Sequence, residues 1–208
     1  MMKRVLSTVL ASLLFLSIPV FAADWFVVAA NLNKSVVAVQ IGERGSCSGF
    51  VIDNERDFVL TAAHCSAKGE DLYVDLAPAK IRAKDTKNDL MVLEVEGIDR
   101  PAMKLANKDP KVGMEVASLG WGYGLNEPLF RLAHVSAVGI NLRESGDPYI
   151  AIDATFVPGQ SGGPVVNEKG EVLMIVQMGT EIVGFGVGAE RIEKSLGKYF
   201  EGRGEKEK

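Results

Sequence analysis

The sequence predicts an all-β fold made of two packed six-stranded antiparallel β-barrels with a short C-terminal helix. Three observations support this fold class. Short segments rich in Val, Ile and Phe recur at the spacing of hairpins. They fall into two sets of six, separated by a stretch rich in Pro, Lys and Asp over residues 97–113. The chain also holds 22 glycines in 208 residues, which allows many turns.

The expected elements follow in chain order. The first set of strands comprises residues 35–42, 48–53, 57–63, 70–76, 79–85 and 90–95, and the second comprises residues 114–120, 130–140, 148–153, 163–167, 171–178 and 181–188. A helix is expected over residues 189–200, because Ile192, Leu196 and Tyr199 recur at helical spacing. The predicted domains are therefore an N-terminal barrel in residues 23–105, a C-terminal barrel with the helix in residues 106–200, and a disordered tail in residues 201–208.

Residues 1–22 have the pattern of a secretory signal. Lys3 and Arg4 precede a short apolar run, and Val20 and Ala22 are small residues at the spacing that signal peptidase requires. An uncleaved membrane anchor is the alternative, but the run is short for a bilayer span and contains several Ser and Thr residues. We expect cleavage after Ala22, a secreted or periplasmic protein, and no stable membrane association afterwards.

The composition argues against nucleic acid and anionic membranes as partners. The whole chain is 47% hydrophobic and 24% charged, as in soluble globular proteins. It has 23 basic and 27 acidic residues, and removal of the signal takes away two basic ones, which leaves 21 − 27 = −6. No basic patch is expected to remain. Export also places Cys47 and Cys65 where disulfides persist.

The strongest local motif is "PGQSGGPVV", residues 158–166. Gly159 and Gly162 allow a sharp turn around Ser161, so that an exposed serine and several amide N–H groups can face a common point. Such donors suit an oxyanion hole, which places N–H groups where negative charge develops in the transition state. An ordinary Gly-rich hairpin is the alternative.

A serine nucleophile needs an adjacent base, and the base needs a third group to orient it. The chain has two histidines. His134 lies mid-strand among apolar neighbours and is interpreted as structural, whereas His64 follows a strand end. For the orienting carboxylate we favour Asp89, which opens an apolar run, with Asp85 as the second candidate. Either aspartate could instead be a solvated turn residue.

Four segments, "GSCSGFVI", "LTAAHC", "NDLMVL" and "PGQSGGPVVN", resemble in order the landmark segments of trypsin-like serine proteases, and the likeness extends over residues 33–195. The resemblance implies the two-barrel fold and a serine endopeptidase that works through an acyl-enzyme. His64 would be the general base and acid, Asp89 its orienting partner and Ser161 the nucleophile. The amides of Gly159 and Ser161 would form the oxyanion hole.

Within that superfamily the chain is most similar to the bacterial HtrA-like branch, with three departures. We expect no peptide-binding PDZ domain after the helix. Gln160 precedes the nucleophile, where digestive proteases have an aspartate that pairs with a freshly cut N-terminus, so activation by that route is not expected. The cysteine pair is shared more with the digestive branch.

The neighbouring His64 and Cys65 raise the question of a metal or thiol site. A zinc site is not expected, because the cysteines and histidines lack the usual ligand spacing and successive side chains of an extended segment diverge. A Cys65 nucleophile would not face the His64 ring. The resemblance instead implies a Cys47–Cys65 disulfide, which would close a loop of 19 residues counted inclusively and contribute roughly 3 kcal/mol to stability.

The specificity pocket follows from the resemblance alone. Thr155, six residues before the nucleophile, would line the floor, and the walls would be formed by Gln177, Met178, Gly179 and Gly186. Because no Asp stands at the floor, we expect small or medium apolar residues before the cut bond rather than Lys or Arg. Hydrolysis of such a bond requires no cofactor or metal.

Two further functions stay open at this point. The chain could be a catalytically silent binding or adhesion module on the same fold, although all three triad positions and the surrounding glycines are present. Esterase activity would be a side reaction of the same site. The expected partners are protein or peptide substrates. Trp25 and Phe26 could pack between subunits of a homo-oligomer or onto their own barrel.

Overall fold

The structure, a computed structural model, describes residues 23–43, 45–66, 70–142 and 148–200. The predicted signal sequence and the predicted disordered tail lie outside the described residues. The elements are, in chain order, α1 (Trp25–Ser35), β1 (Val36–Ile41), β2 (Gly45–Asp53), β3 (Phe58–Ala62), β4 (Leu72–Val74), β5 (Ala77–Asp85), β6 (Leu90–Glu94), β7 (Glu115–Gly120), β8 (Leu129–Ile140), β9 (Tyr149–Ile152), β10 (Pro164–Val166), β11 (Val172–Gly179), β12 (Gly184–Gly188), α2 (Ala189–Leu196) and the 3₁₀ turn η1 (Gly197–Tyr199).

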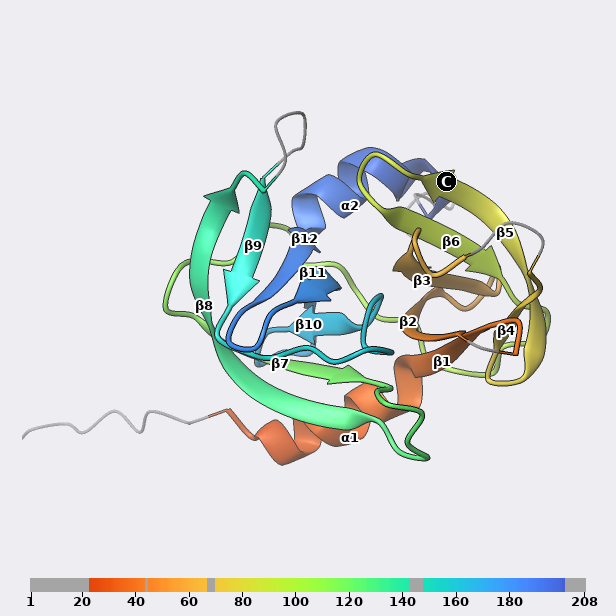
Figure 1. The fold of residues 1–208 in the computed structure, drawn as a ribbon, viewed down its shortest axis with the longest axis horizontal. Coiled ribbons are helices and arrows are strands. Elements are labelled where there is room, and N and C mark those ends of the chain that lie inside the picture. Colours follow the sequence, from red (N-terminus) through yellow and green to blue (C-terminus); the bar gives the residue numbers. More distant parts are fainter. Residues whose placement is uncertain (1–22, 44, 67–69, 143–147, 201–208) are drawn as a thin grey trace, which may run out of the picture.

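The strands form two closed antiparallel barrels that lie side by side (Figure 1). The first has the strand order β1-β2-β3-β6-β5-β4 and the second the order β10-β11-β12-β9-β8-β7. Closure removes the exposed sheet edges that would otherwise invite aggregation. The predicted fold class is therefore confirmed, and each of the described strands overlaps the segment that the hydrophobic pattern predicted.

Three apolar clusters hold the barrels together. One lies in the first barrel and includes Val59 and Met91, and another lies in the second barrel and includes Ile152; all three side chains are fully buried. The third includes Phe50 and Ile175 and joins residues of both barrels and both helices. Because successive strand residues point to opposite faces, one strand can serve the barrel interior and the contact between barrels at once. This packing keeps the two barrels in a fixed relation.

Helix α1 was not among the expected elements. Asp24 accepts a hydrogen bond from the Val27 amide at 3.3 Å and caps the helix. Val28 and Leu32 are buried on one face, while Phe26 on the other is 82% exposed. No helix among the described residues is long and apolar enough to cross a membrane.

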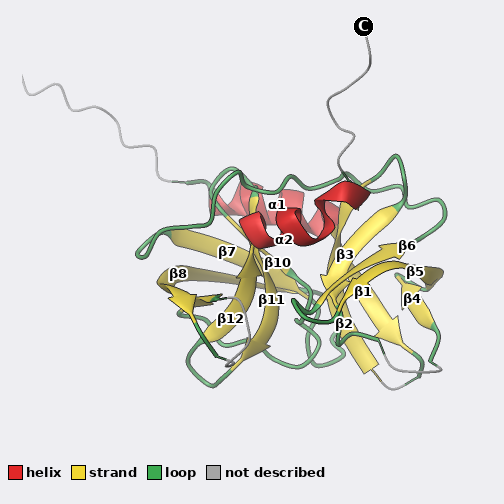
Figure 2. Cartoon of the chain, turned by 90° about the horizontal axis from the view of Figure 1, so that it is seen from above, coloured by secondary structure: helices red, strands yellow, loops and turns green. Residues whose placement is uncertain are grey.

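The expected C-terminal helix begins where predicted, continues as α2 to Leu196 and ends in η1. Ile192 and Leu196 are buried, as the helical spacing indicated. Both helices lie on one side of the two barrels (Figure 2). From there α2 reaches across to the first barrel, where Ser195 donates a hydrogen bond to Asp85 at the end of β5.

Candidate active site

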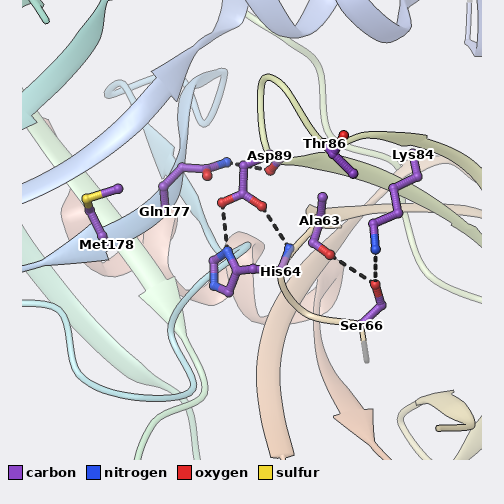
Figure 3. A pocket seen from close by; sticks show the side chains of 8 residues that line it. All are labelled: Ala63, His64, Ser66, Lys84, Thr86, Asp89, Gln177 and Met178. Carbon is purple, nitrogen blue, oxygen red and sulfur yellow. Dashed lines mark hydrogen bonds and ion pairs between the residues drawn. The ribbon is translucent and has the colours of Figure 1, made fainter. Parts of the chain in front are cut away.

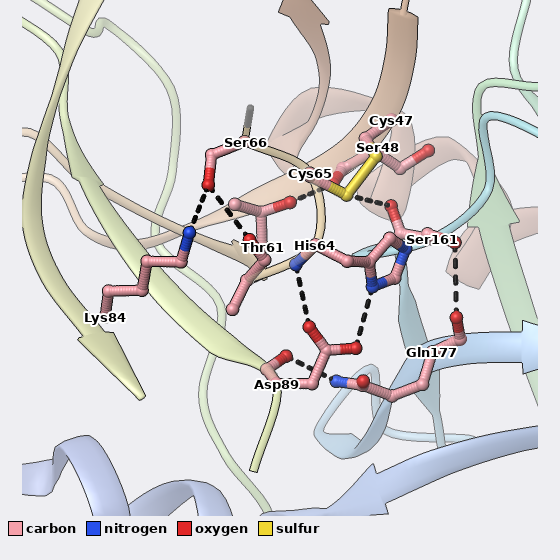
Figure 4. A network of polar contacts seen from close by, with 11 residues as sticks. Cys47, Ser48, Thr61, His64, Cys65, Ser66, Lys84, Asp89, Ser161 and Gln177 are labelled. Carbon is pink, nitrogen blue, oxygen red and sulfur yellow. Dashed lines mark hydrogen bonds and ion pairs between the residues drawn. A yellow bond between two sulfur atoms is a disulfide. The ribbon is translucent and has the colours of Figure 1, made fainter. Parts of the chain in front are cut away.

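His64 and Asp89 are brought together by strand register. β3 pairs with β6 such that Ala62 lies opposite Leu90, so the residues just beyond this pair, His64 and Asp89, are neighbours. Asp89 Oδ1 accepts a hydrogen bond from the His64 backbone N–H at 2.7 Å, and Asp89 Oδ2 lies 2.7 Å from His64 Nδ1. The Asp89 side chain is only 13% exposed. The two contacts fix both the position and the orientation of the imidazole (Figure 4).

This pairing also defines how the ring can act. A proton on Nδ1 faces the carboxylate, so Nε2 of the neutral ring remains as the acceptor. The His64 side chain is 45% exposed and borders a cavity of about 450 Å³. The cavity is lined by Ala63, His64, Ser66, Lys84, Thr86, Asp89, Gln177 and Met178 (Figure 3). The His64 side chain is thus only partly buried, beside a cavity whose lining does not include Ser161.

Ser161 lies in the loop between β9 and β10 on the second barrel. Gly159 has φ +101° and Gly162 has φ +85°, a left-handed region that glycine adopts without the steric cost that other residues meet. A side chain on Gly162 would also collide with Ser48 and Thr61 of the first barrel. A side chain on Gly159 would likewise lie 2.8 Å from the Trp121 oxygen, so both glycines permit a left-handed turn and a close approach, Gly159 within the second barrel and Gly162 between the two barrels.

The Ser161 hydroxyl donates to the backbone oxygen of Gln177 at 3.3 Å. This distance is long for an O–H···O bond, so the contact constrains the hydroxyl weakly. Within the described residues no hydrogen bond joins Ser161 Oγ to the His64 ring. The amide N–H groups of Gly159 and Ser161 likewise donate to no described residue.

Ser48 is a site residue that sequence reasoning missed. It is fully buried in β2, and its amide donates to the Ser161 oxygen at 2.8 Å. Its hydroxyl donates to the Gly159 oxygen at 2.8 Å and accepts from the Trp121 amide at 2.8 Å. Ser48 thus links the loop that carries Ser161 to the first barrel by hydrogen bonds. Its place in the segment "GSCSGFVI", next to Cys47 of the disulfide, was the available signal.

Gln177 also has a role that was not expected. It is a predicted wall residue of the specificity pocket, yet its side chain is buried and its Nε2 donates to the Asp89 backbone oxygen at 2.7 Å. Its own backbone oxygen receives the Ser161 hydroxyl. One residue of β11 therefore contacts both the acid of the first barrel and the serine of the second.

The Cys47–Cys65 disulfide is present, which confirms the expected pairing. It joins β2 to the residue after His64, and Cys65 is fully buried. A nitrogen of the His64 ring and the two sulfurs lie within 4.8 Å of one another, a spacing that could hold a metal ion. Thiolates are required for such a site, however, and both sulfurs are used in the disulfide.

The other expected pocket residues lie around one pair of strands. Gly179 of β11 is paired with Gly184 of β12, and a side chain added to either glycine would meet Phe156. Thr155 Oγ1 donates to the Glu181 oxygen at 2.6 Å. Gly186, by contrast, is paired with Val176 further along the sheet. Gly184, which sequence reasoning did not single out, is the glycine that faces Gly179.

His134, which we interpret as structural, lies in β8 with its side chain at the surface. Its side chain is 57% exposed, because alternate residues of β8 face solvent. Asp153 accepts a hydrogen bond from the His134 backbone N–H and lies 3.3 Å from its Nδ1. The His134 N–H bond is the main reason that the pKa of Asp153 is held below its ordinary value.

A histidine–aspartate pair on one barrel that faces a serine loop on the other is the architecture of the chymotrypsin-like class. The model of the trypsin-like peptidase domain family matches residues 47–175. The chain therefore belongs to the trypsin-like peptidase domain family.

Curated relatives agree with this membership. Probable periplasmic serine endoproteases, DegP-like, from Pseudomonas fluorescens and Pseudomonas fulva are 35% and 37% identical over 135 residues, which is 62% of this chain. The match spans 28% of the length of these relatives.

Solved structures show the same two-barrel fold. The active form of the Rv3671c protease from M. tuberculosis has a TM-score of 0.70 at 26% identity, with 82% of this chain and 83% of that chain covered. The serine endoprotease from Yersinia pestis has a TM-score of 0.74 at 23% identity, with 88% of this chain and 69% of that chain covered. The latter likeness concerns the fold alone.

Proposed function

We propose that the chain is an exported serine endopeptidase that hydrolyses peptide bonds through His64, Asp89 and Ser161. The observation that carries this proposal is the two-point contact of Asp89 with His64, in a chain whose family membership implies a serine nucleophile at Ser161. The names of the DegP-like relatives support both the protease activity and a periplasmic location.

In the proposed mechanism His64 accepts the proton of Ser161 as the hydroxyl oxygen attacks the substrate carbonyl. The weak bond from the Ser161 hydroxyl to Gln177 must first break, and a rotation about the serine Cα–Cβ bond redirects the hydroxyl toward Nε2. Catalytic hydrogen bonds are often long before substrate binds. Asp89 stabilises the imidazolium that forms, and His64 then returns the proton to the leaving amine. Water releases the acyl group by the same steps.

The amides of Gly159 and Ser161 are the proposed oxyanion hole. Neither N–H donates to a described residue, which leaves both for a substrate oxygen. The bond from the Ser48 hydroxyl to the Gly159 oxygen fixes the turn between them. Preorganised donors of this kind stabilise the tetrahedral intermediate without the cost of reorienting solvent.

The proposed substrates have small or medium apolar residues before the cut bond. Gly179 and Gly184 leave room between β11 and β12, but Phe156 occupies part of that room. Phe156 therefore limits the length of the side chain that can enter, and Thr155 at the expected floor offers no carboxylate to Lys or Arg. In this proposal Gly184 takes the wall position that the sequence assigned to Gly186, beside Thr155.

A fluorophosphonate probe tests the enzyme proposal. We expect covalent labelling of Ser161 in folded wild-type protein and none in Ser161→Ala. Casein cleavage should disappear in the same variant, and profiling of a peptide library should give the preference at the cut site. An unlabelled Ser161 in folded protein would instead favour a catalytically silent binding module.

A further inference from the structure

The acid loop, residues 85–89, is held at both ends by groups from the second half of the chain. At its start, Ser195 of α2 donates to Asp85 Oδ2 at 2.5 Å. At its end, Gln177 of β11 donates to the Asp89 oxygen at 2.7 Å. The loop that carries the proposed orienting acid therefore depends on contacts across the two barrels.

Asp85 organises the interior of this loop. Its Oδ1 accepts from the Lys87 and Asn88 amides, each at 3.0 Å. Its Oδ2 accepts from Asn88 Nδ2 at 2.7 Å in addition to Ser195. Burial alone would raise the pKa of Asp85, but these hydrogen bonds outweigh it and hold the pKa below its ordinary value. The carboxylate is thus the centre of a network rather than a solvated turn residue.

This network matters because Asp89 has an unfavourable backbone conformation. Its φ of +55° is left-handed, a region that costs a non-glycine residue on the order of 1 kcal/mol. Such a conformation persists only where its surroundings enforce it. It aims the carboxylate at both His64 N and His64 Nδ1, so a small change in the loop would disturb both contacts.

The chain contains a second copy of the same turn, which serves as an internal reference. Asp53 Oδ1 accepts from the Glu55 and Arg56 amides at 3.0 and 3.1 Å. Asp57, four residues later, has φ +59°, and its Oδ2 accepts a hydrogen bond from the Gly97 amide, just after β6, at 3.1 Å. The Arg56 guanidinium of this turn donates a hydrogen bond to the Tyr199 oxygen of η1. No described hydrogen bond joins the Asp53 carboxylate to the second barrel. Arg56 Nε lies 3.8 Å from Asp53 Oδ2, so the turn has an ion pair from one of its own residues where the acid loop has Ser195.

We propose that Asp85 and Ser195 are positioning residues that hold Asp89 against His64, so that the C-terminal helix maintains the geometry of the base. This inference rests on the proposed function, and it deepens that function by adding two residues that touch neither substrate nor the reacting atoms. Ser195 binds the Asp85 carboxylate, Asp85 binds the amides of the acid loop, and the loop conformation orients the Asp89 carboxylate toward His64.

The experiment uses Ser195→Ala and Asp85→Asn in the 208-residue chain. Ser195→Ala loses the hydrogen bond to the Asp85 carboxylate, but alanine is a better helix former than serine and offsets part of that loss, so the variant should still fold with a somewhat lower stability. We expect kcat to fall by about 10-fold in Ser195→Ala and by up to about 100-fold in Asp85→Asn, with KM little changed. Ser195→Thr, which keeps the hydroxyl, should restore kcat. Because both residues act in one network, the double variant should be no worse than Asp85→Asn alone.

Matched controls separate positioning from stability. Asp53→Asn makes the same change in the reference turn, and Ser136→Ala removes an exposed hydroxyl on β8. Both should leave kcat and KM at the wild-type values, although Asp53→Asn should lower the melting temperature.

The decisive measurement is the low-field proton NMR signal of the His64 Nδ1–H that is bonded to Asp89, recorded with His134→Gln so that one imidazole remains. We expect the signal to shift or broaden in Ser195→Ala and to stay unchanged in Asp53→Asn. An unchanged signal in Ser195→Ala overturns the positioning proposal, whatever the activity. An inactive wild type in which Ser195→Ala still alters the signal overturns the proposed function and supports the positioning role.

Discussion

Each barrel carries one histidine–aspartate pair, and the two pairs have the same kinds of contact. In both, the aspartate accepts a hydrogen bond from the histidine backbone N–H and faces the ring Nδ1. The Nδ1–Oδ2 distance is 2.7 Å for His64–Asp89 and 3.3 Å for His134–Asp153. The kinds of contact alone therefore do not distinguish the proposed catalytic pair from a surface pair.

The surroundings of the two pairs differ. Asp89 is 13% exposed and Asp153 is 51% exposed. Gln177 of the second barrel bonds to Asp89, whereas no described hydrogen bond joins His134 or Asp153 to the first barrel. The two pairs therefore differ in their contacts with distant parts of the chain: β11 contacts Asp89 through Gln177, and the Asp153 pair has no such contact among the described residues.

The largest difference in kcat should be between the alanine variants of the two histidines. We expect His64→Ala to lower kcat by roughly 10⁶-fold, because it removes the only proposed base beside Ser161. His134→Ala should keep wild-type kcat and KM. Peptide hydrolysis by the two purified variants gives the comparison, and a large loss in His134→Ala would contradict the assignment of the base.

Replacement of the two aspartates should also lower kcat only in the first barrel, and by a smaller factor than replacement of His64. Asp89→Ala should lower kcat on the order of 10⁴-fold, since the ring loses its orientation and the imidazolium loses its partner. Asp153→Ala should leave kcat unchanged. Equal losses in the two variants would show that the C-terminal pair also takes part in the reaction.

The disulfide is a further difference between the two pairs, because it links the residue after His64 to β2. The chain has no other cysteine that could form such a bond near His134. Replacement of Cys47 and Cys65 by serine should lower the free energy of unfolding by about 3 kcal/mol and reduce kcat. Denaturant unfolding and peptide hydrolysis measure the two effects. Unchanged stability together with full activity would show that the bond does not anchor the base.

The smallest effect concerns pH and the exposed pair. Because the pKa of Asp153 is lowered from 3.8, its contribution to stability is present above that pH and is lost as the pH falls through the folded-state pKa. For a pair this exposed the contribution is at most about 1 kcal/mol. Wild type should exceed Asp153→Asn in denaturant stability at pH 7, and the difference should vanish near pH 2. A difference that grows toward low pH would contradict this sign.

Much of the fold could be predicted because strand signals are local. Runs of β-branched and aromatic residues between turn residues indicated the strands directly, and a resemblance in four segments indicated the pairing of Cys47 with Cys65. Helix α1 was missed because a short helix with a Val-rich start gains its stability from packing rather than from propensity. Val28 and Leu32 supply that packing only once the barrels exist.

The sequence and the resemblance it carries determined the strand segments and favoured His64, Asp89 and Ser161 as site residues, with His134 and Asp85 as the alternatives. Tertiary structure alone gave Asp85 its hydrogen bond from Ser195. It also gave Ser48 and Gln177 their places between the barrels. The reason is physical: these contacts join residues that are far apart in the chain, so they depend on how two finished barrels pack and leave no periodic trace in the sequence.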